Sequence, residues 1–347
     1  MSLECRVLTD NAQEQEAWDK FVRSSPDGTI FHLTAWRQVV EKIFRHKPHY
    51  LLATRKGEIC AVLPLFEIWG LLAGHILISV PYGVYGGLCG FDPEARAALL
   101  DKTKELAAQL KVRYVELRHL YKPSPDLPTT SFFDTFVMPI APSPESNMAN
   151  IPRKRRAMIR QGIREGLEAR RGWEPLAEFH EIYARNRQRL GAPPFSLRLF
   201  EALRDYLGRE AQLLTVWHEG RMAAGVISFF YGDRVMPYYA AALPEAFSLA
   251  VDDFKYWELM RESCLSGFKI FDFGQSHAGS GTYEFKRHWG ATPEPLAYQY
   301  LVNSGQTFPN SDPSIPRRRP LVEAWKYLPL TLTKWIGPEL IRRLPLH

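Results

Sequence analysis

A single lysine lies in the part of this sequence that is best suited to bind a ligand. Lys286 is flanked by aromatic residues in the run FDFGQSHAGSGTYEFKRHWG, which covers residues 271–290. The alternation of apolar and polar residues predicts a strand that Gly274 stops, and a Gly/Ser loop and a short helical turn capped by Thr282 come next. In α/β folds, ligands bind beyond the carboxyl ends of such strands. The alternative is an ordinary turn with core aromatic residues and a solvated lysine.

A second candidate is a basic helix predicted over residues 152–168. Residues 151–171 hold eight Lys or Arg and two acidic residues. At 100° per residue, one cationic stripe and one apolar stripe lie side by side on this helix. The cationic stripe comprises Arg153, Arg156, Arg160 and Arg164, and the apolar stripe comprises Ile159, Ile163 and Leu167. Cations in the first turn oppose the helix dipole, which favours an anionic partner such as a pyrophosphate or the acceptor end of a tRNA. The alternative is a solvated basic helix.

A third candidate is the stretch ISVPYGVYGG, residues 78–87, which follows a predicted strand. Its glycines permit close approach of the backbone to a ligand, and its tyrosines offer an apolar face together with a hydroxyl group. Residue statistics alone favour a substrate cleft and a half-buried strand-end turn equally.

These stretches together resemble the FemAB-like acyltransferases. The pattern of strand, Asp-Phe-Gly, glycine loop and Phe-Lys-x-x-Trp-Gly is similar to the signature of that family's second domain. The basic helix and the S-x-P-Y…Y-G-G stretch are similar to other parts of the same family, in particular its exosortase/PEP-CTERM-associated branch. The resemblance covers most of the chain. It implies an α/β (α+β) fold with two tandem GNAT-like domains, each a mixed central sheet flanked by helices.

The resemblance implies an N-acyltransferase that moves an aminoacyl or acyl group to an amine of a cell-envelope, exopolysaccharide or peptidoglycan-type precursor. The amine would attack the donor carbonyl directly, without an acyl-enzyme. We expect no tightly bound cofactor, and a co-substrate that is either aminoacyl-tRNA or acyl-CoA. The glycine-rich pyrophosphate loop of acetyl-CoA-binding domains is not visible between Leu243 and Asp253, where PEAFSLAV stands. That departure favours a second hypothesis, a non-catalytic scaffold protein with degenerate domains.

Roles follow for particular residues. Lys286 matches the family lysine and is expected beside the donor ester and its developing negative charge. Asp253 or His277 is expected to take the amine proton, from position alone. The expected phosphate ligands are Lys154, Arg155, Arg156 and Arg160. The expected acceptor cleft is lined by Trp36, Tyr82, Tyr85, Tyr283 and Phe285.

Composition narrows the class of protein. The chain has 347 residues, 46% of them hydrophobic and 24% charged, which suits two globular domains. Four widely spaced cysteines and ten histidines without ligand spacing predict reduced thiols and no metal site. The N-terminus lacks the features of a signal peptide, so we expect a cytoplasmic protein. The apolar region 60–80 contains Pro64 and Glu67, and a buried hairpin is favoured there over a membrane span. A plain nucleic-acid binder would need more aromatic residues among the basic ones.

Proline-rich segments at 122–130 and 139–147 predict a domain boundary, with an N-terminal domain over 1–140 and a C-terminal domain over 141–308. Residues 309–347 are a linker and an amphipathic tail that Pro329, Pro338 and Pro345 break into short helices. The tail either contacts the inner membrane peripherally, through Trp325, Trp335 and its arginines, or packs on the body of the protein.

Overall fold

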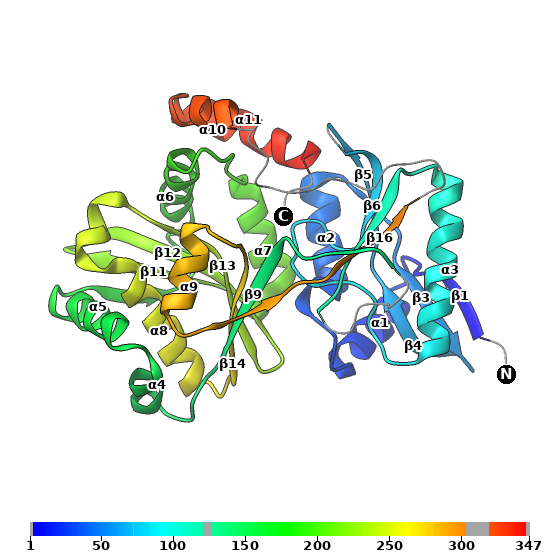
Figure 1. Cartoon of the computed structure of the whole chain (residues 1–347), viewed down its shortest axis with the longest axis horizontal. Coiled ribbons are helices and arrows are strands. Elements are labelled where there is room, and N and C mark those ends of the chain that lie inside the picture. The colour runs from blue at the N-terminus through cyan, green and yellow to red at the C-terminus, as the bar shows by residue number, and fades with distance from the viewer. Residues whose placement is uncertain (1–2, 72, 121–126, 303–318, 345–347) are drawn as a thin grey trace. The chain divides into compact units, whose positions relative to one another are not determined.

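The computed structural model describes residues 3–71, 73–120, 127–302 and 319–344, and these group into two compact units. The first unit comprises the described residues of Met1–Ser131, Leu296–Asp312 and Leu340–His347. The second comprises those of Phe132–Pro295 and Pro313–Glu339. Figure 1 shows helices packed against a sheet in each unit.

The first unit contains two sheets. The smaller has the strand order β1-β3-β4, and the larger, of mixed direction, has the order β2-β5-β6-β7-β16-β8. The strands are β1 (Leu3–Val7), β2 (Lys47–Pro48), β3 (Leu51–Arg55), β4 (Glu58–Leu63), β5 (Phe66–Gly70), β6 (Gly74–Ile78), β7 (Tyr114–Arg118), β8 (Thr129–Thr130) and β16 (Tyr298–Val302). The helices are α1 (Ala12–Ser24), η1 (Ile30–His32), α2 (Thr34–Phe44) and α3 (Pro93–Leu110). Helix α2 starts at Thr34 and α3 follows Asp92, whose carboxylate accepts from Ala95 N at 3.0 Å as an N-cap.

The second unit is built on one mixed sheet of order β10-β11-β12-β13-β14-β9-β15. Its strands are β9 (Phe133–Pro139), β10 (Glu168–Arg171), β11 (Ala211–His218), β12 (Arg221–Tyr231), β13 (Arg234–Ala242), β14 (Ile270–His277) and β15 (Thr292–Pro295). Its helices are α4 (Pro144–Asn150), α5 (Arg153–Arg164), α6 (Leu176–Arg189), α7 (Leu197–Leu207), η2 (Gly208–Glu210), η3 (Pro244–Leu249), α8 (Val251–Leu265), α9 (Gly281–His288), α10 (Arg319–Lys326) and α11, which begins at Leu330.

Helices cover both faces of this sheet, and β12 shows why. Gly225 lies against the ring of Phe179 from α6, while its neighbours Ala224 and Val226 belong to the apolar core that also contains Phe254 of α8. Because side chains alternate along a strand, α6 and α8 must lie on opposite faces.

Two strands are grouped differently from the predicted division at residue 140. β9 precedes the basic helix but pairs with β14 and β15 in the second unit, and β16 pairs with β7 in the first. The proline-rich segments mark the region where the chain passes from the first unit to the second. Composition, however, carries no information about which sheet a strand joins.

Several predicted element ends were wrong. The basic helix was expected over 152–168, yet α5 ends at Arg164, because Gly166 has a φ of +73° and Leu167 N–H donates back to Gly162 O at 3.1 Å. Ser280, not Thr282, caps α9, and its hydroxyl accepts from Tyr283 N.

The tail helix α11 runs from Leu330 to Arg343 and contains Pro338 within it, so the predicted break there was wrong. One side of the tail is buried, including Trp325, Thr333 and Ile341, whereas Trp335 is 79% exposed. Pro345 and most of the predicted linker lie outside the described residues. None of the described helices is both long and apolar enough to cross a membrane.

Candidate active site

The candidate site of the second unit begins where two parallel strands part. β13 and β14 pair only at Arg234↔Ile270 and Val235↔Phe271, although each strand continues for several residues. Beyond these pairs, the facing edges of β13 and β14 are not bonded to each other. Such a parting leaves backbone groups and side chains available to a ligand at the centre of the sheet.

Asp272 is the first residue of β14 after the parting, and it is fully buried. Its carboxylate accepts from the Arg234 guanidinium at 2.6 Å and from Gly274 N at 2.8 Å. Gly274 has a φ of +67° and sits at a shift in the register with β9. The prediction that Gly274 stops the strand was therefore wrong, because the glycine forms a bulge and β14 continues to His277. A buried carboxylate thus fixes the bulge.

Lys286 reaches this bulge from α9. Its amine donates to Gly274 O at 3.0 Å and to Gln275 O at 2.8 Å, and it lies 5.6 Å from the centre of the Phe136 ring. Burial lowers the pKa of the Lys286 amine to about 7, and the charge of Asp272 opposes that shift. The amine is therefore held at the bulge of β14, with both protonation states accessible near neutral pH. An amine with three donors that gives two to the backbone retains one for a ligand.

A second cluster surrounds Asp253 in the first turn of α8. Its carboxylate accepts from Arg155 at 3.1 Å and from the indole N–H of Trp289 at 3.0 Å. The Arg155 guanidinium also lies 5.4 Å from the centre of the Phe285 ring. Burial raises the pKa of Asp253, while the charge and hydrogen bond of Arg155 oppose the shift. This carboxylate ties α5, α8 and α9 together.

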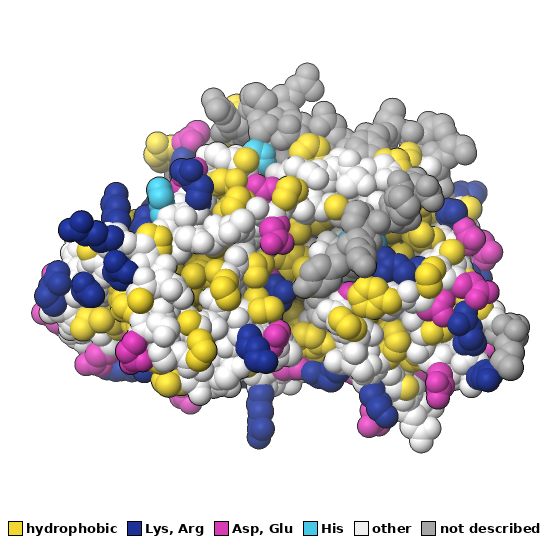
Figure 2. Space-filling model, turned by 60° about the horizontal axis from the view of Figure 1, so that its bottom comes forward, with side chains coloured by type: hydrophobic (Ala, Val, Ile, Leu, Met, Phe, Trp, Pro, Cys, Tyr) yellow, Lys and Arg dark blue, Asp and Glu magenta, His cyan; other side chains and the backbone are white. Residues whose placement is uncertain are grey.

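The other predicted phosphate ligands lie on the outer side of α5. Lys154 and Arg160 are exposed, and Arg156 donates to Ala149 O at 2.7 Å. Lysine and arginine side chains gather at the left of Figure 2, the side on which Figure 1 places α5. The apolar stripe was wrong at Ile163, which is 51% exposed, because α5 buries the side that carries Ile159 and Gly162.

His277 ends β14 and is half-buried, with its ring centre 6.1 Å from that of Phe133. Tyr283, on α9, packs edge-on against Phe136 with ring centres 4.8 Å apart. Of the predicted cleft residues, Tyr283 and Phe285 thus lie in the second unit with Lys286.

The remaining predicted cleft residues, Trp36, Tyr82 and Tyr85, lie in the first unit and are all buried. The Tyr82 ring stacks on Phe44 at 3.8 Å, and its hydroxyl donates to Ile341 O at 3.3 Å. Tyr82 also has a φ of +62°, an uncommon backbone conformation for a bulky residue that needs support from its surroundings.

Tyr82 and Tyr85 belong to a segment, residues 80–90, that is buried throughout without being helix or strand. Buried side chains satisfy its backbone: Arg118 donates to Val80 O at 3.2 Å and to Gly83 O at 2.7 Å. Arg118 is itself paired with the buried carboxylate of Glu116 at 2.8 Å. The segment is therefore rigidly organised, which an interior loop requires.

The connection after β13 differs from a glycine-rich phosphate loop. Residues 244–249 form the 3₁₀ helix η3, and the next helix, α8, carries Asp252 and Asp253 in its first turn. Two carboxylates in the first turn of a helix already interact with the positive end of the helix dipole, and their negative charges repel a pyrophosphate. They therefore oppose the binding of a pyrophosphate at this N-terminus.

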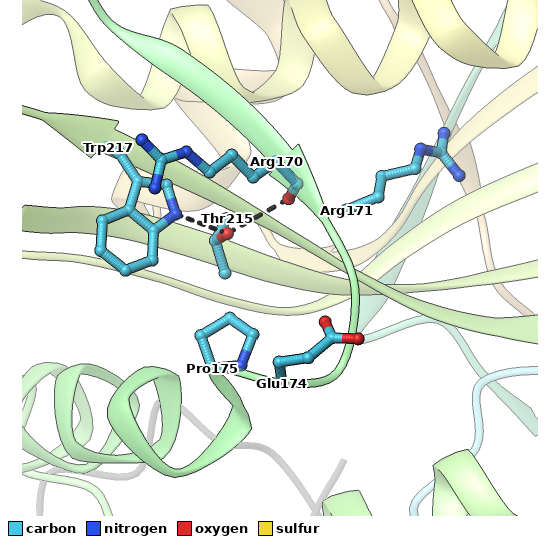
Figure 3. A pocket seen from close by; sticks show the side chains of 6 residues that line it. All are labelled: Arg170, Arg171, Glu174, Pro175, Thr215 and Trp217. Atoms are coloured by element: carbon cyan, nitrogen blue, oxygen red, sulfur yellow. Dashed lines mark hydrogen bonds between the residues drawn. The ribbon is translucent and has the colours of Figure 1, made fainter. Parts of the chain in front are cut away.

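An open cavity of about 410 Å³ lies at β10 and β11. Figure 3 shows Arg170 lying along Trp217, 4.7 Å from the ring centre, and the indole N–H donating to Thr215. Arg170 is paired with Glu168 and Arg171 with Glu262. Because these guanidinium charges are compensated, the cavity gives little support for an anionic ligand.

Sequence reasoning missed Asp272 and Arg234. The signal for Asp272 was a charged residue between two phenylalanines of a predicted strand. Its partner Arg234, 38 residues earlier, has no comparable signal in the sequence. Among the described residues, no cluster of three or more His, Cys, Asp or Glu could hold a metal ion.

Comparison with known proteins supports the assignment of the fold. Residues 146–287 match the family model described as an acetyltransferase (GNAT) domain. No curated protein matches the sequence. Similar solved structures include FemX, with 17% identity, a TM-score of 0.67, and coverage of 86% of this chain and 97% of that one.

Two further structures cover most of both chains. L-PGS from Bacillus licheniformis has 14% identity and a TM-score of 0.56, covering 97% of this chain and 98% of that one. A tandem GNAT protein from the clavulanic acid biosynthesis pathway has 11% identity and a TM-score of 0.54, covering 88% and 100%. The predicted fold, two mixed sheets flanked by helices as in tandem GNAT structures, is confirmed.

Proposed function

We propose that this GNAT-fold protein transfers an aminoacyl group to an amine of a cell-envelope or exopolysaccharide precursor. The observation that carries the proposal is the Lys286 amine, held by two carbonyls where β13 and β14 part, inside the matched acetyltransferase domain. FemX and L-PGS, which share the fold, support an aminoacyl donor. The exosortase-associated branch remains an expectation from the sequence resemblance alone.

In the proposed reaction, the acceptor amine attacks the donor carbonyl and forms a C–N bond. The negative charge that develops on the carbonyl oxygen is stabilised by the remaining N–H of protonated Lys286. When the tetrahedral intermediate collapses, the C–O bond to the tRNA ribose breaks, and the amine proton passes to that leaving oxygen. Asp253 was expected to accept this proton, but its bonds to Arg155 and Trp289 favour a positioning role. His277 remains the candidate proton carrier.

Two features favour aminoacyl-tRNA over acyl-CoA as the donor. Asp252 and Asp253 occupy the helix terminus where a CoA pyrophosphate would need a positive environment. The exposed cations Lys154 and Arg160 on α5 offer contacts to an RNA backbone instead. Arg155 is less available for that role, because Asp253 and Phe285 hold it.

Besides the missing glycine-rich loop, one structural observation favours the scaffold alternative. The first unit's share of the expected acceptor cleft is buried, namely Trp36, Tyr82 and Tyr85. A binding protein would retain the fold and the basic helix without turnover.

Donor binding and single-turnover transfer test these proposals together. The purified protein would be titrated with aminoacyl-tRNA at two salt concentrations and, separately, with acetyl-CoA. We expect salt-dependent tRNA binding that the K154E/R160E variant loses, and Lys286→Ala should retain tRNA binding and lose transfer.

Arg287→Ala is the matched control, since Arg287 is exposed on the same helix and paired with Glu284. Saturable acetyl-CoA binding without tRNA binding would reverse the donor assignment. Binding of tRNA without transfer by the wild-type protein to any envelope amine would favour the scaffold.

A further inference from the structure

The turn between β5 and β6 presents apolar side chains to solvent. Trp69 is 69% exposed and Leu71 is 58% exposed. The sequence from Ile68 to Gly74, IWGLLAG, contains no charged residue. Surface turns are normally polar, and large exposed apolar groups that adjoin one another mark contact sites. The free end of this ribbon is seen at the top of the first unit in Figure 1.

The exposed indole is held in place from below. The Trp69 ring stacks on the His75 ring with centres 3.9 Å apart and an interplanar angle of 7°. His75 Nε2 contacts Glu67 Oε1 at 2.8 Å, and His49 Nε2 contacts the other oxygen at 3.1 Å. The network restrains the indole while one of its faces remains open, so little conformational entropy is lost when that face is covered.

Cations surround this turn. Arg113 is exposed and donates to Ala73 O at 3.1 Å, and Leu71 N–H donates to Arg343 O at 2.8 Å. Arg343 is exposed, whereas Arg342 is half-buried and its charge acts on His46 and Tyr82. Exposed Lys47 lies opposite Glu67 in the β2–β5 pairing. The carboxylate in this set, Glu67, already faces two histidines. The turn therefore combines an apolar tip with a positively charged rim.

We propose that this tip, Trp69 and Leu71 with Arg113 and Arg343 beside it, docks on an anionic lipid bilayer. Tryptophan suits the boundary between headgroups and acyl chains, because its ring is apolar and its N–H is polar. Arginines at the same level attract anionic headgroups and extend their apolar stems along the bilayer. The arginines complement the charge of anionic headgroups. An apolar protein partner would instead desolvate these arginines without pairing them, so a lipid surface is favoured.

Co-sedimentation with lipid vesicles tests the proposal. The full chain would be mixed with vesicles of phosphatidylcholine alone and of phosphatidylcholine with about one third phosphatidylglycerol. We expect binding to the anionic vesicles that weakens with salt, and a loss of at least about tenfold in affinity for the W69S/L71S variant. Arg113→Glu should also weaken binding, by a smaller factor that high salt removes.

Trp335→Ser is the matched control, because Trp335 is 79% exposed on the tail helix, against 69% for Trp69, and lies outside this turn. Unchanged binding of W335S assigns the contact to the turn, whereas loss in W335S with retention in W69S/L71S would assign it to the tail and overturn the proposal. Absence of wild-type binding to anionic vesicles would overturn it too. So would a dimer in sedimentation velocity that W69S/L71S dissociates, since the tip would then contact a second copy of the chain.

The vesicle measurement requires no turnover, so its outcome is independent of the proposed acyl transfer.

Discussion

The burial of Lys286 makes the stability of this protein depend on pH in a defined direction. In the unfolded chain the amine keeps its proton up to its ordinary pKa of 10.5, whereas in the folded protein the pKa is lowered to about 7. Between these values the unfolded state binds more protons, so the free energy of unfolding rises with pH. The difference between the two pKa values corresponds to about 5 kcal/mol. This amount lowers the free energy of unfolding below about pH 7 and disappears above about pH 10.5.

Replacing the lysine by methionine removes the titrating group at similar length. The two carbonyls that Lys286 satisfies lose their donor, which gives the variant a constant cost of about 1–3 kcal/mol each. The titration of Lys286 adds a contribution that varies with pH. Between pH 6 and pH 9 the free energy of unfolding of wild type should rise by about 3 kcal/mol relative to that of Lys286→Met. The constant cost cancels in this comparison.

Urea unfolding of both proteins across this pH range measures the difference, with Arg287→Met as a control whose difference from wild type should not change with pH. If the difference between wild type and Lys286→Met stays constant within about 0.5 kcal/mol, the amine titrates near its ordinary value. The argument that burial against the bulge of β14 governs the protonation of Lys286 would then be refuted.

Three further substitutions test other parts of the structure. Arg118→Met removes the guanidinium that pairs with the buried Glu116 carboxylate, so thermal denaturation should show a loss of about 3–5 kcal/mol, and a loss below about 1 kcal/mol would mean that water reaches the pair. Asp92→Ala removes the cap of α3 and should cost about 1 kcal/mol in urea unfolding, without any change in donor binding. Trp289→Phe removes one donor to Asp253 and should cost about 1–3 kcal/mol in urea unfolding; an unchanged stability would show that Arg155 alone satisfies the carboxylate.

Local patterns predicted the elements well where one face had to be buried. The helix beginning at Pro93 follows from the Asp92 cap and the proline at its first position, and the helix beginning at Thr34 follows from apolar periodicity. These signals act over a few residues. Ile163 shows the limit: it lies on the predicted apolar stripe, but α5 packs through Ile159 and Gly162, with Gly162 against Phe254 of α8, and Ile163 is exposed.

The surroundings of Lys286 could be predicted only in part. The glycine run indicated that the lysine stood near a strand end, and the structure places its amine on the carbonyls of that strand. The ion pair of Asp272 and Arg234, by contrast, joins residues brought together by the parallel pairing of β13 and β14. Similarly, the basic helix looked uniformly available for phosphates, but contact with Asp253 turns Arg155 inward, and only tertiary packing reveals that.

The placement of β9 and β16 has a consequence for synthesis of the chain on the ribosome. The larger sheet of the first unit lacks β16 until residue 302 has left the exit tunnel, long after its other strands. Until then β7 presents an unpaired edge, which can pair with a strand of another chain. The first unit cannot complete its fold while the second is being made, so truncation before residue 298 should yield a fragment prone to aggregation, and nascent chains of this protein should depend on chaperones throughout translation.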